Sequence, residues 1–386
     1  MFLSKLDSLS NAQKLVNDNC KLMEVEEIPL FKAHKRVLAE DIIAFHDSPP
    51  FDKSAMDGFA VIGENTFGAS QSSPKMLKII DAIGAGDFSD KTVGENEAIV
   101  IATGAPIPDG ANAVIMKEYT TTDGDELTIY SQVTPGENVS PKSEDIEKGQ
   151  KILDKNTFIR YQELGLIASA GYDTVKVFKK PRVKIIITGN ELVEPTKEEI
   201  DKAKIINSNQ FTINALVEDS GAIAEITHAG DTFDEVKEAI LKASEDYDVI
   251  MTTGGTAISK GDVVLDVVDD IGEILFHGVA IRPGKPAGAG VVNGKMVFTF
   301  SGQPVAAMSQ FDMFARKYLF EMQGRSFDFH IVNRESQLKI PSQLGRTDFI
   351  RAVSDDEYAK HVLNRGSGII RSMVEANSYI IIDEND

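Results

Sequence analysis

Two glycine-containing loops in the second half of the chain are the first candidates for chemistry. The segments Thr188-Gly-Asn-Glu-Leu192 and Thr252-Thr-Gly-Gly-Thr-Ala-Ile-Ser-Lys-Gly-Asp262 each follow directly on an apolar run. The paired glycines Gly254 and Gly255 would let the backbone approach a ligand closely, and free backbone N–H groups in such loops suit an anion. The alternative is that the glycine pair only makes a tight turn.

Each of these loops also carries a carboxylate. Glu191 and Asp262 could hold Mg²⁺, a hard cation that takes carboxylate oxygens together with the phosphates of a substrate. The other interpretation makes Asp262 the cap of a following helix. Both interpretations stay open on spacing alone.

A basic loop, Ala280-Ile-Arg-Pro-Gly-Lys-Pro286, carries two cations three residues apart. Arg282 and Lys285 stand among prolines that stiffen the segment, and fixed cations of this kind suit an oxyanion or a phosphate. The alternative is a solvated surface turn. The sequence has no Gly-x-x-x-x-Gly-Lys-Ser/Thr pattern, which excludes a P-loop.

The composition limits the kinds of partner. The 386 residues include 40 basic and 60 acidic ones, a formal net charge of −20. This charge disfavours nucleic-acid binding, because phosphate backbones need clustered Lys and Arg. The single cysteine, Cys20, cannot form an intrachain disulfide and agrees with a reducing cytoplasm. Without a visible signal peptide or an apolar stretch of roughly 20 residues, we expect a cytoplasmic protein that makes no membrane contact.

The loops must be positioned by the elements around them, and residues 183–322 predict alternating strands and helices. Val183–Thr188 and Asp248–Thr253 are continuous apolar runs, as expected for strands buried in a parallel sheet. Thr232-Phe-Asp-Glu235 fits a capping box at the start of a helix. The pattern predicts a doubly wound α/β domain, whose ligands bind at the carboxyl ends of the strands.

The remainder of the chain predicts mixed and β structure. Short apolar runs between Gly, Asp and Pro over residues 59–149 indicate a β-rich domain, and residues 157–171 return to a helix. We therefore predict a multidomain fold of the α/β plus β class. Its parts would be an N-terminal linking domain (1–45 and 150–180), a β-rich domain (46–149), the α/β domain (181–325) and a small C-terminal β domain (326–386).

Several of these motifs occur together in one known family. The segment Asp52-Lys-Ser-Ala-Met-Asp-Gly-Phe-Ala60 resembles the MoeA family of molybdopterin molybdenumtransferases, which includes the gephyrin E domain. Thr103-Gly-Ala-Pro-Ile-Pro108 resembles the same family. The two glycine loops, the basic loop and the turn Gly302-Gln-Pro304 follow in the family's order, so the resemblance covers nearly the whole chain.

The resemblance implies the last step of molybdenum cofactor synthesis, in which adenylylated molybdopterin and molybdate give molybdenum cofactor and AMP. It implies a need for Mg²⁺ and an elongated homodimer, with the active cleft between the molybdopterin-binding α/β domain of one subunit and the N-terminal β region of the other. Molybdopterin adenylyltransferase and molybdoenzymes would be transient partners.

Matching the family's motifs residue by residue implies a set of site residues. The functional acids would be Asp57, Asp145, Glu191, Asp231 and Asp262, with Glu191 and Asp262 holding the metal. The substrate-binding residues would be Ser54, Thr103, Gly104, Gly254, Gly255, Thr256, Arg282, Pro283, Lys285 and Gly302. The acids would hold Mg²⁺ on the phosphoanhydride and the cations would hold molybdate. Each acid could instead be a cap or a turn residue, above all Asp231, which directly precedes the capping box.

The sequence departs from the family pattern at several positions. Ser140 stands where the family has an arginine, Ser143 where it has a glycine, and Gly278 where it often has a lysine. The turn Ser301-Gly-Gln-Pro304 replaces Pro-Gly-Asn-Pro. Because molybdate and the substrate phosphates are anions, the loss of two cations predicts an active enzyme that needs unusually high molybdate.

Two other functions stay open on the sequence. A nucleotidyltransferase or pyrophosphatase could use the same α/β domain, although a single-domain enzyme of that kind would lack residues 1–180. A non-catalytic molybdopterin-binding or scaffold protein could keep the whole fold, and the changes at Ser140 and in the 301–304 turn favour it slightly. Turnover of adenylylated molybdopterin with molybdate separates these alternatives from the enzyme.

Overall fold

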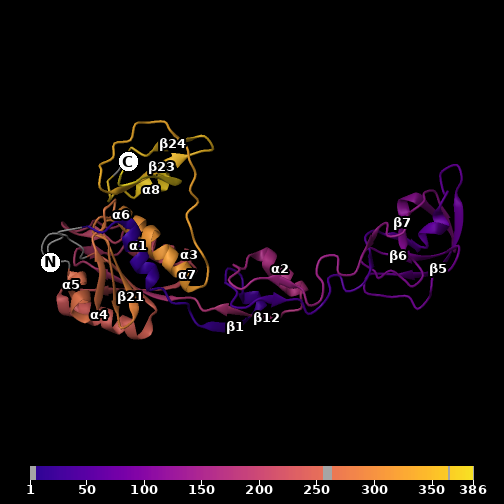
Figure 1. The fold of residues 1–386 in the computed structure, drawn as a ribbon, viewed down its shortest axis with the longest axis horizontal. Helices are drawn as coiled ribbons and strands as arrows, with labels where there is room; N and C mark the ends of the chain where they lie inside the picture. The colour runs from indigo at the N-terminus through magenta and orange to yellow at the C-terminus, as the bar shows by residue number, and fades with distance from the viewer. Residues whose placement is uncertain (1–5, 255–262, 364–365, 386) are drawn as a thin grey trace. The chain divides into compact units, whose positions relative to one another are not determined.

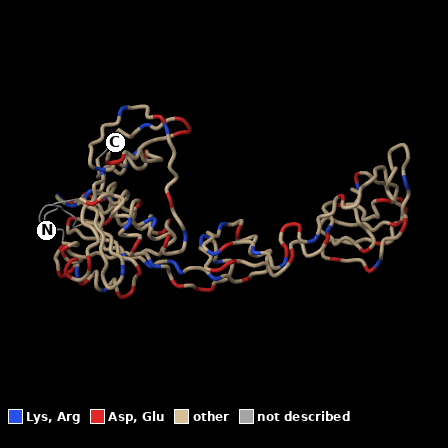
Figure 2. Tube along the Cα trace, viewed as in Figure 1, with Lys and Arg blue, Asp and Glu red and all other residues tan. Residues whose placement is uncertain are grey.

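The chain forms two compact units in its computed structural model, which describes residues 6–254, 263–363 and 366–385. The first unit comprises residues 1–26, 35–39 and 176–386, and the second comprises residues 27–34 and 40–175 (Figure 1). Acidic residues are scattered along the trace of both units rather than gathered in one segment (Figure 2). No helix of the described residues is long and apolar enough to cross a membrane.

The larger sheet of the first unit has six strands, four of which pair parallel with one another. Their order is β16-β13-β17-β21-β20-β18, with the bounds Ile223–Ala229, Arg182–Thr188, Val249–Thr253, Lys295–Phe300, Gly288–Val292 and Glu273–His277. β20 pairs antiparallel with both of its neighbours, so the sheet is mixed toward one edge. Every residue of β17 is buried, as continuous apolar strands covered on both faces require.

Helices cover both faces of this sheet, which confirms the expected α/β architecture (Figure 1). Ile185 and Ile187 pack with one group of helices, and Ile186 packs with the other, because successive side chains of a strand point to opposite faces. The first group is α1 (Leu9–Asp18), α3 (Asn209–Asp219), α6 (Pro304–Gln310), the π-helical turn η4 (Phe311–Ala315) and α7 (Arg316–Met322). The second group is α4 (Phe233–Asp246) and α5 (Val263–Ile271).

The capping box expected at the start of α4 is present. The Thr232 hydroxyl accepts a hydrogen bond from the Glu235 N–H at 3.4 Å, and the Glu235 carboxylate accepts from the Thr232 N–H at 3.3 Å. These bonds satisfy backbone donors that the first helical turn leaves unpaired. The helix therefore begins where the sequence predicts.

A smaller sheet joins the C-terminal residues to the basic loop of the first unit. Its order is β19-β23-β24-β22, with β25 also paired to β23; the bounds are Ile281–Arg282, Thr347–Ser354, Tyr358–His361, Glu335–Ser336 and Ser378–Ile382. A short helix, α8 (Arg371–Glu375), accompanies it. β19 lies within the basic loop and pairs parallel with β23, placing Arg282 opposite Asp348. The regular elements of the C-terminal segment are therefore mostly strands, as expected.

The second unit is built on a six-stranded sheet of order β7-β4-β6-β5-β9-β8. The bounds are Ala113–Met116, Gly58–Val61, Glu97–Ile101, Lys75–Ile83, Glu126–Ile129 and Thr120–Asp123. Two small antiparallel pairs are β2 (Ile42–Ile43) with β11 (Lys151–Leu153) and β3 (Lys53–Ser54) with β10 (Val139–Ser140). Its short helical turns are η1 (Leu30–Lys32), η2 (Gly63–Thr66) and η3 (Lys117–Tyr119). Two further strand pairs complete the described strands: β1 (Val25–Pro29) with β12 (Thr174–Phe178) and, in the first unit, β14 (Leu192–Val193) with β15 (Ile205–Ile206).

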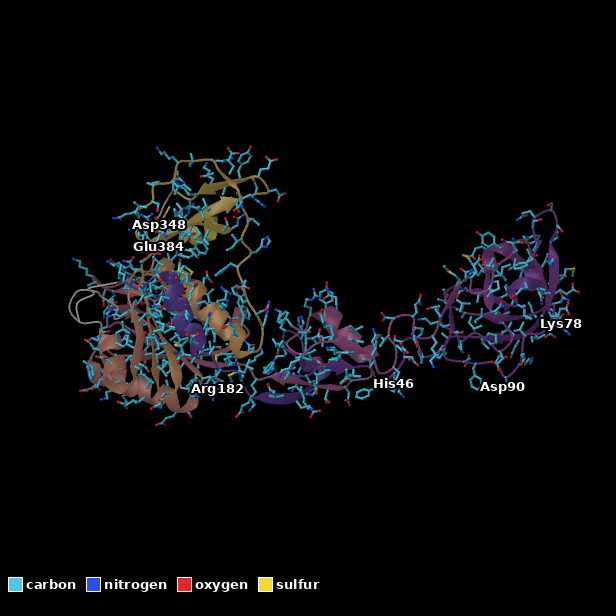
Figure 3. The ribbon with its side chains drawn as sticks, viewed as in Figure 1. His46, Lys78, Asp90, Arg182, Asp348 and Glu384 are labelled. Carbon is cyan, nitrogen blue, oxygen red and sulfur yellow. The ribbon has the colours of Figure 1, made fainter. Side chains whose placement is uncertain are left out.

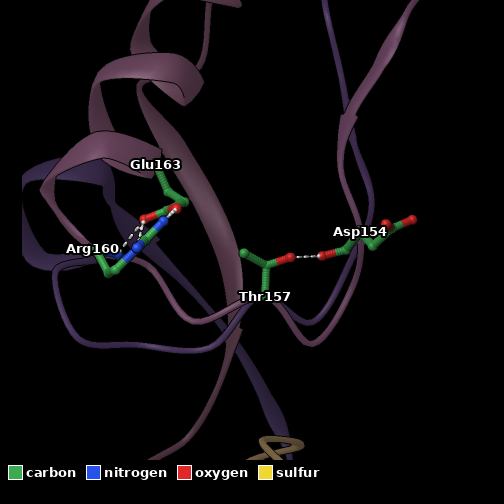
Figure 4. Close-up of polar contacts among 4 residues, drawn as sticks. All are labelled: Asp154, Thr157, Arg160 and Glu163. Atoms are coloured by element: carbon green, nitrogen blue, oxygen red, sulfur yellow. Dashed lines mark hydrogen bonds and ion pairs between the residues drawn. The ribbon is translucent and has the colours of Figure 1, made fainter. Parts of the chain in front are cut away.

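The single α-helix described in the second unit, α2 (Tyr161–Ser169), starts at a charged pair. Arg160 donates through Nε and Nη2 to the Glu163 carboxylate, which also accepts from the Arg160 backbone N–H at 2.9 Å (Figure 4). Just before it, the Thr157 hydroxyl donates to the Asp154 carbonyl at 2.6 Å. The hydrogen bonds from the Arg160 side chain, opposed by burial, lower the pKa of Glu163 to about 2.

Candidate active site

A cavity of about 1140 Å³ opens in the first unit where three parallel strands end. Its lining includes Glu191 from the loop after β13, Gly254 from the loop after β17 and Gly302 from the loop after β21. Arg282, Pro283 and Lys285 of the basic loop line it as well, so six of the expected residues lie around one space. This is the position at which open α/β sheets bind ligands.

Two glycines form part of the cavity wall with bare backbone. Gly254 has φ of +99°, and a Cβ added there would lie 2.2 Å from the Thr188 carbonyl oxygen. A side chain at this position would therefore collide with the end of β13. A Cβ on Gly302 would lie 3.5 Å from the Gly254 Cα, which is ordinary contact. The ends of β13 and β17 approach so closely only because residue 254 is glycine.

A buried carboxylate organises the cationic side of the cavity. Asp348 on β23 is fully buried and accepts hydrogen bonds from the Arg282 guanidinium, from Arg346 Nε at 3.0 Å and from the Ser342 hydroxyl at 3.0 Å (Asp348 is labelled in Figure 3). Arg346 also lines the cavity. Two guanidinium groups therefore share one carboxylate, and the cluster keeps a net positive charge beside Lys285.

Sequence reasoning missed both Arg346 and Asp348. They lie far along the chain from the basic loop, and the pairing of β19 with β23 brings them to it. A lone Gly-Arg pair in a predicted β segment gives no local signal of such a contact. Only the tertiary pairing identifies these residues.

The loop after β13 is held by Asp231, which lies two residues beyond the end of β16. The Asp231 carboxylate accepts a hydrogen bond from the Asn190 N–H at 2.8 Å, and Lys204 Nζ donates to the Asn190 carbonyl at 2.7 Å. Asp231 is not among the residues that line the cavity, so its observed contact supports the loop. The neighbouring Glu191 lines the cavity, and its carboxylate has no hydrogen-bond or ion-pair partner among the described residues.

Three expected site residues, Gly255, Thr256 and Asp262, lie outside the described residues. Among the described ranges there is no group of three or more His, Cys, Asp or Glu residues that could hold a metal ion. Of the two expected metal ligands, only Glu191 is placed by the structure.

A second group of expected residues lies in the second unit, around Asp57. Its carboxylate oxygen Oδ1 accepts from the Thr103 N–H at 2.8 Å and from the Thr103 hydroxyl at 2.7 Å, while Lys117 Nζ lies 3.7 Å from Oδ2. The bonds from Thr103, and less strongly the Lys117 charge, lower the pKa of Asp57. Asp57 is exposed and therefore presents a fixed negative charge to solvent or a ligand.

The turn that carries Asp57 is held by backbone contacts. Ser54 is buried, and its hydroxyl donates to the Met56 carbonyl at 2.5 Å, while Gly104 N–H donates to the Ser54 carbonyl at 2.8 Å. Gly58 follows Asp57 at the start of β4, where a Cβ would come within 2.0 Å of the Ile115 carbonyl oxygen on β7. The glycine is required for strand packing, and the serine shapes the turn.

The last expected acid, Asp145, is exposed, and its N–H donates to the Ser48 carbonyl at 3.0 Å. The carboxylate of Asp145 has no partner among the described residues. The segment before it runs beside the Asp57 turn, because Val139 and Ser140 of β10 pair with Ser54 and Lys53 of β3. This pairing places the segment that leads to Asp145 next to the segment that leads to Asp57.

Comparison with known proteins identifies the family. The MoeA N-terminal region (domain I and II) matches residues 7–171, the family described as "Probable molybdopterin binding domain" matches 184–321, and the MoeA C-terminal region (domain IV) matches 334–386. A Methanocaldococcus jannaschii protein named for molybdopterin biosynthesis is 38% identical over 398 residues, covering 99% of this chain and 95% of that protein. The chain belongs to the MoeA family.

Further relatives agree with this assignment. A Staphylococcus aureus protein named molybdopterin molybdenumtransferase is 38% identical over 314 residues, covering 81% of this chain and 74% of that protein. The crystal structure of a molybdopterin biosynthesis MoeA protein from Pyrococcus horikoshii OT3 superposes with a TM-score of 0.84 at 35% identity, covering 99% and 96% of the two chains. The predicted family and the multidomain α/β plus β fold are confirmed.

Three of the expected departures from the MoeA pattern have a local structural setting. Ser143 has φ of +62°, in the left-handed region that suits the glycine expected there, and Gly278 has φ of +84°, which a lysine rarely adopts. The Ser140 hydroxyl bonds the Glu144 carboxylate. Lys142, a candidate substitute for the missing cations, pairs with Asp47 at 3.1 Å.

Proposed function

We propose that this chain inserts molybdenum into adenylylated molybdopterin, giving molybdenum cofactor and AMP. The observation that carries the proposal is the cavity at the carboxyl ends of β13, β17 and β21, where cations, glycine backbone and a carboxylate lie together. Substrates with phosphate groups and a tetrahedral oxyanion need this combination. The family membership supports the same reaction.

The cations of the cavity would bind the anionic groups. Lys285 and the paired Arg282 and Arg346 would hold molybdate and the substrate phosphates, since Asp348 neutralises only one of the two guanidinium charges. The bare backbone at Gly254 and Gly302 would allow the substrate to lie close to the strand ends. Insertion is ligand exchange at molybdenum, so the chain needs no redox group of its own.

The carboxylate of Glu191 suits a hard cation, because it faces the cavity without a protein partner among the described residues. We propose that Glu191, with Asp262, would hold Mg²⁺, which when bound would neutralise charge on the phosphoanhydride. Asp231 would act through the loop that it supports rather than on the metal.

We propose that a homodimer is the functional form, with Asp57, Thr103 and Asp145 completing the site. Mixing Asp57→Ala and Glu191→Ala variants should then restore activity, because a mixed dimer would contain one intact site. No recovery after demonstrated subunit exchange would contradict a shared site. The adenylyltransferase that makes the substrate and the molybdoenzymes that receive the product are the proposed transient partners.

The direct test combines the purified chain with adenylylated molybdopterin, molybdate and Mg²⁺. AMP release should depend on molybdate and should be matched by product that activates an apo-molybdoenzyme. AMP release without molybdate would instead favour a hydrolase, and binding without turnover would favour a scaffold protein.

Two matched variants sharpen this test. Glu191→Gln should lower turnover by about 100-fold, the effect of removing a charge contact that stabilises a transition state. Glu194→Gln is the control, because Glu194 lies in the same loop region but accepts from Gln210 and does not line the cavity. Equal activities for the two variants would refute the role of Glu191.

A further inference from the structure

The turn at residues 301–304 begins with a backbone donor, the N–H of Ser301. Ser301 is buried, so its N–H needs an acceptor within the protein. The Oε1 atom of Gln310 supplies it, at 2.7 Å from the Ser301 nitrogen. The serine at 301 and the glutamine at 310 are thus a hydrogen-bonded pair nine residues apart.

The same glutamine also reaches the basic loop. Gln310, the last residue of α6, is fully buried, and its Nε2 donates to the Gly284 carbonyl at 2.8 Å. Gly284 has φ of +102°, and a Cβ there would lie 2.8 Å from Gln310 Cγ. The loop backbone therefore rests directly on the Gln310 side chain.

We infer that Gln310 is a positioning residue that sets the basic loop relative to the turn at 301–304. One amide group joins the two backbones that carry Arg282, Lys285 and Gly302, all of which line the cavity. The inference deepens the proposed function, on which its catalytic consequence rests.

The test replaces Gln310 by methionine, which keeps the length of the side chain but removes both hydrogen bonds. The molybdate KM should rise roughly 10-fold while kcat changes less than about 3-fold, because loosening the loop weakens anion binding more than it alters the acids. Gln323→Met is the matched control. Gln323 is also buried and donates to the Ser220 and Leu319 carbonyls, but it does not line the cavity.

A second substitution tests the coupling between the two residues. Ser301→Pro should raise the molybdate KM above that of Ser301→Ala. Both variants lose the hydroxyl that accepts from the Gln303 N–H at 3.2 Å, but only the proline leaves the buried Gln310 oxygen without a donor. In a chain that already carries Gln310→Met, Ser301→Pro and Ser301→Ala should have almost the same KM. Additive effects of the two substitutions would overturn the pairing.

The readouts distinguish this inference from the proposed function. If the wild-type chain turns over, equal molybdate KM values for Gln310→Met, Gln323→Met and wild type would overturn the inference. If the wild-type chain does not turn over, the proposed function fails, and binding of tungstate alone becomes the readout. Stabilisation by tungstate that is lost in Gln310→Met and kept in Gln323→Met would still support the positioning role; equal stabilisation would overturn it.

Discussion

Replacing Arg346 by glutamine should weaken the use of an anionic substrate without unfolding the chain. Arg346 bonds Asp348 through Nε, and its two Nη groups have no protein partner among the described residues although the side chain lines the cavity. Asp348 would keep the Arg282 guanidinium and the Ser342 hydroxyl as donors. The fold should therefore tolerate the loss of the third donor.

The size of the effect follows from the contact that is lost. A hydrogen bond to a charged group contributes about 1.5–3 kcal/mol. The Arg346 side chain is 27% exposed, so solvent screening places the expected loss near the lower end, about 1.5–2 kcal/mol. This corresponds to a rise of roughly 10–30-fold in the substrate concentration needed for half-maximal rate.

Initial rates should be measured against molybdate at fixed adenylylated molybdopterin, and then with the two substrates exchanged. The substrate whose KM rises is the one that Arg346 contacts. Arg334→Gln serves as the control, because Arg334 donates to the Asp355 carbonyl and does not line this cavity. If neither KM changes in folded Arg346→Gln protein, the assignment of Arg346 to anion binding is wrong.

Three further predictions concern stability. The folded-state pKa of Glu163 is lowered to about 2. The contribution of its carboxylate to folding stability is therefore complete above about pH 4.5 and is lost as the pH falls toward 2. Glu163→Gln should lower the free energy of unfolding by about 1 kcal/mol at pH 7, a modest value because Arg160 is exposed to solvent. Urea unfolding should show that the difference between the variant and wild type shrinks from pH 5 to pH 3. Gly254→Ala should lower the free energy of unfolding by about 2–4 kcal/mol, because the residue has a positive φ and the new Cβ would clash with Thr188. Gly302→Ala should leave the free energy of unfolding nearly unchanged. Equal urea unfolding midpoints for the two variants would contradict the packing argument. Ser143→Gly should raise the free energy of unfolding by about 0.5–1 kcal/mol by relieving a left-handed serine, and a loss of stability would show that the serine hydroxyl matters more.

Features encoded locally could be predicted from the sequence. The capping box at Thr232 and Glu235 determines the start of α4 through neighbours three residues apart. The apolar runs that became β13 and β17 identify strands buried on both faces. The glycine and acidic residues after such strands must then lie at one edge of the sheet, which places Glu191 and Gly254 at a common cavity.

Features that depend on distant contacts could not be predicted in this way. The roles of Asp348 and Gln310 arise from tertiary pairing, and the π-helical turn Phe311–Ala315 interrupts a run that looks like one continuous helix in sequence. The hydrogen bond from the Ser301 N–H to a side chain nine residues later has no local signal in the sequence. The division at residues 45, 149, 180 and 325 stays a prediction.

The pairing of β19 with β23 has a consequence for the integrity of the chain. Residues 325–334 form no helix or strand, and Phe329 and Ile331 are exposed there. A protease should therefore cleave the chain in this segment. A nick would nevertheless leave the two fragments joined, because Arg282 and Asp348 face each other across paired strands and are tied by an ion pair. Apparent size under native conditions would not reveal such damage, and only a denaturing gel would.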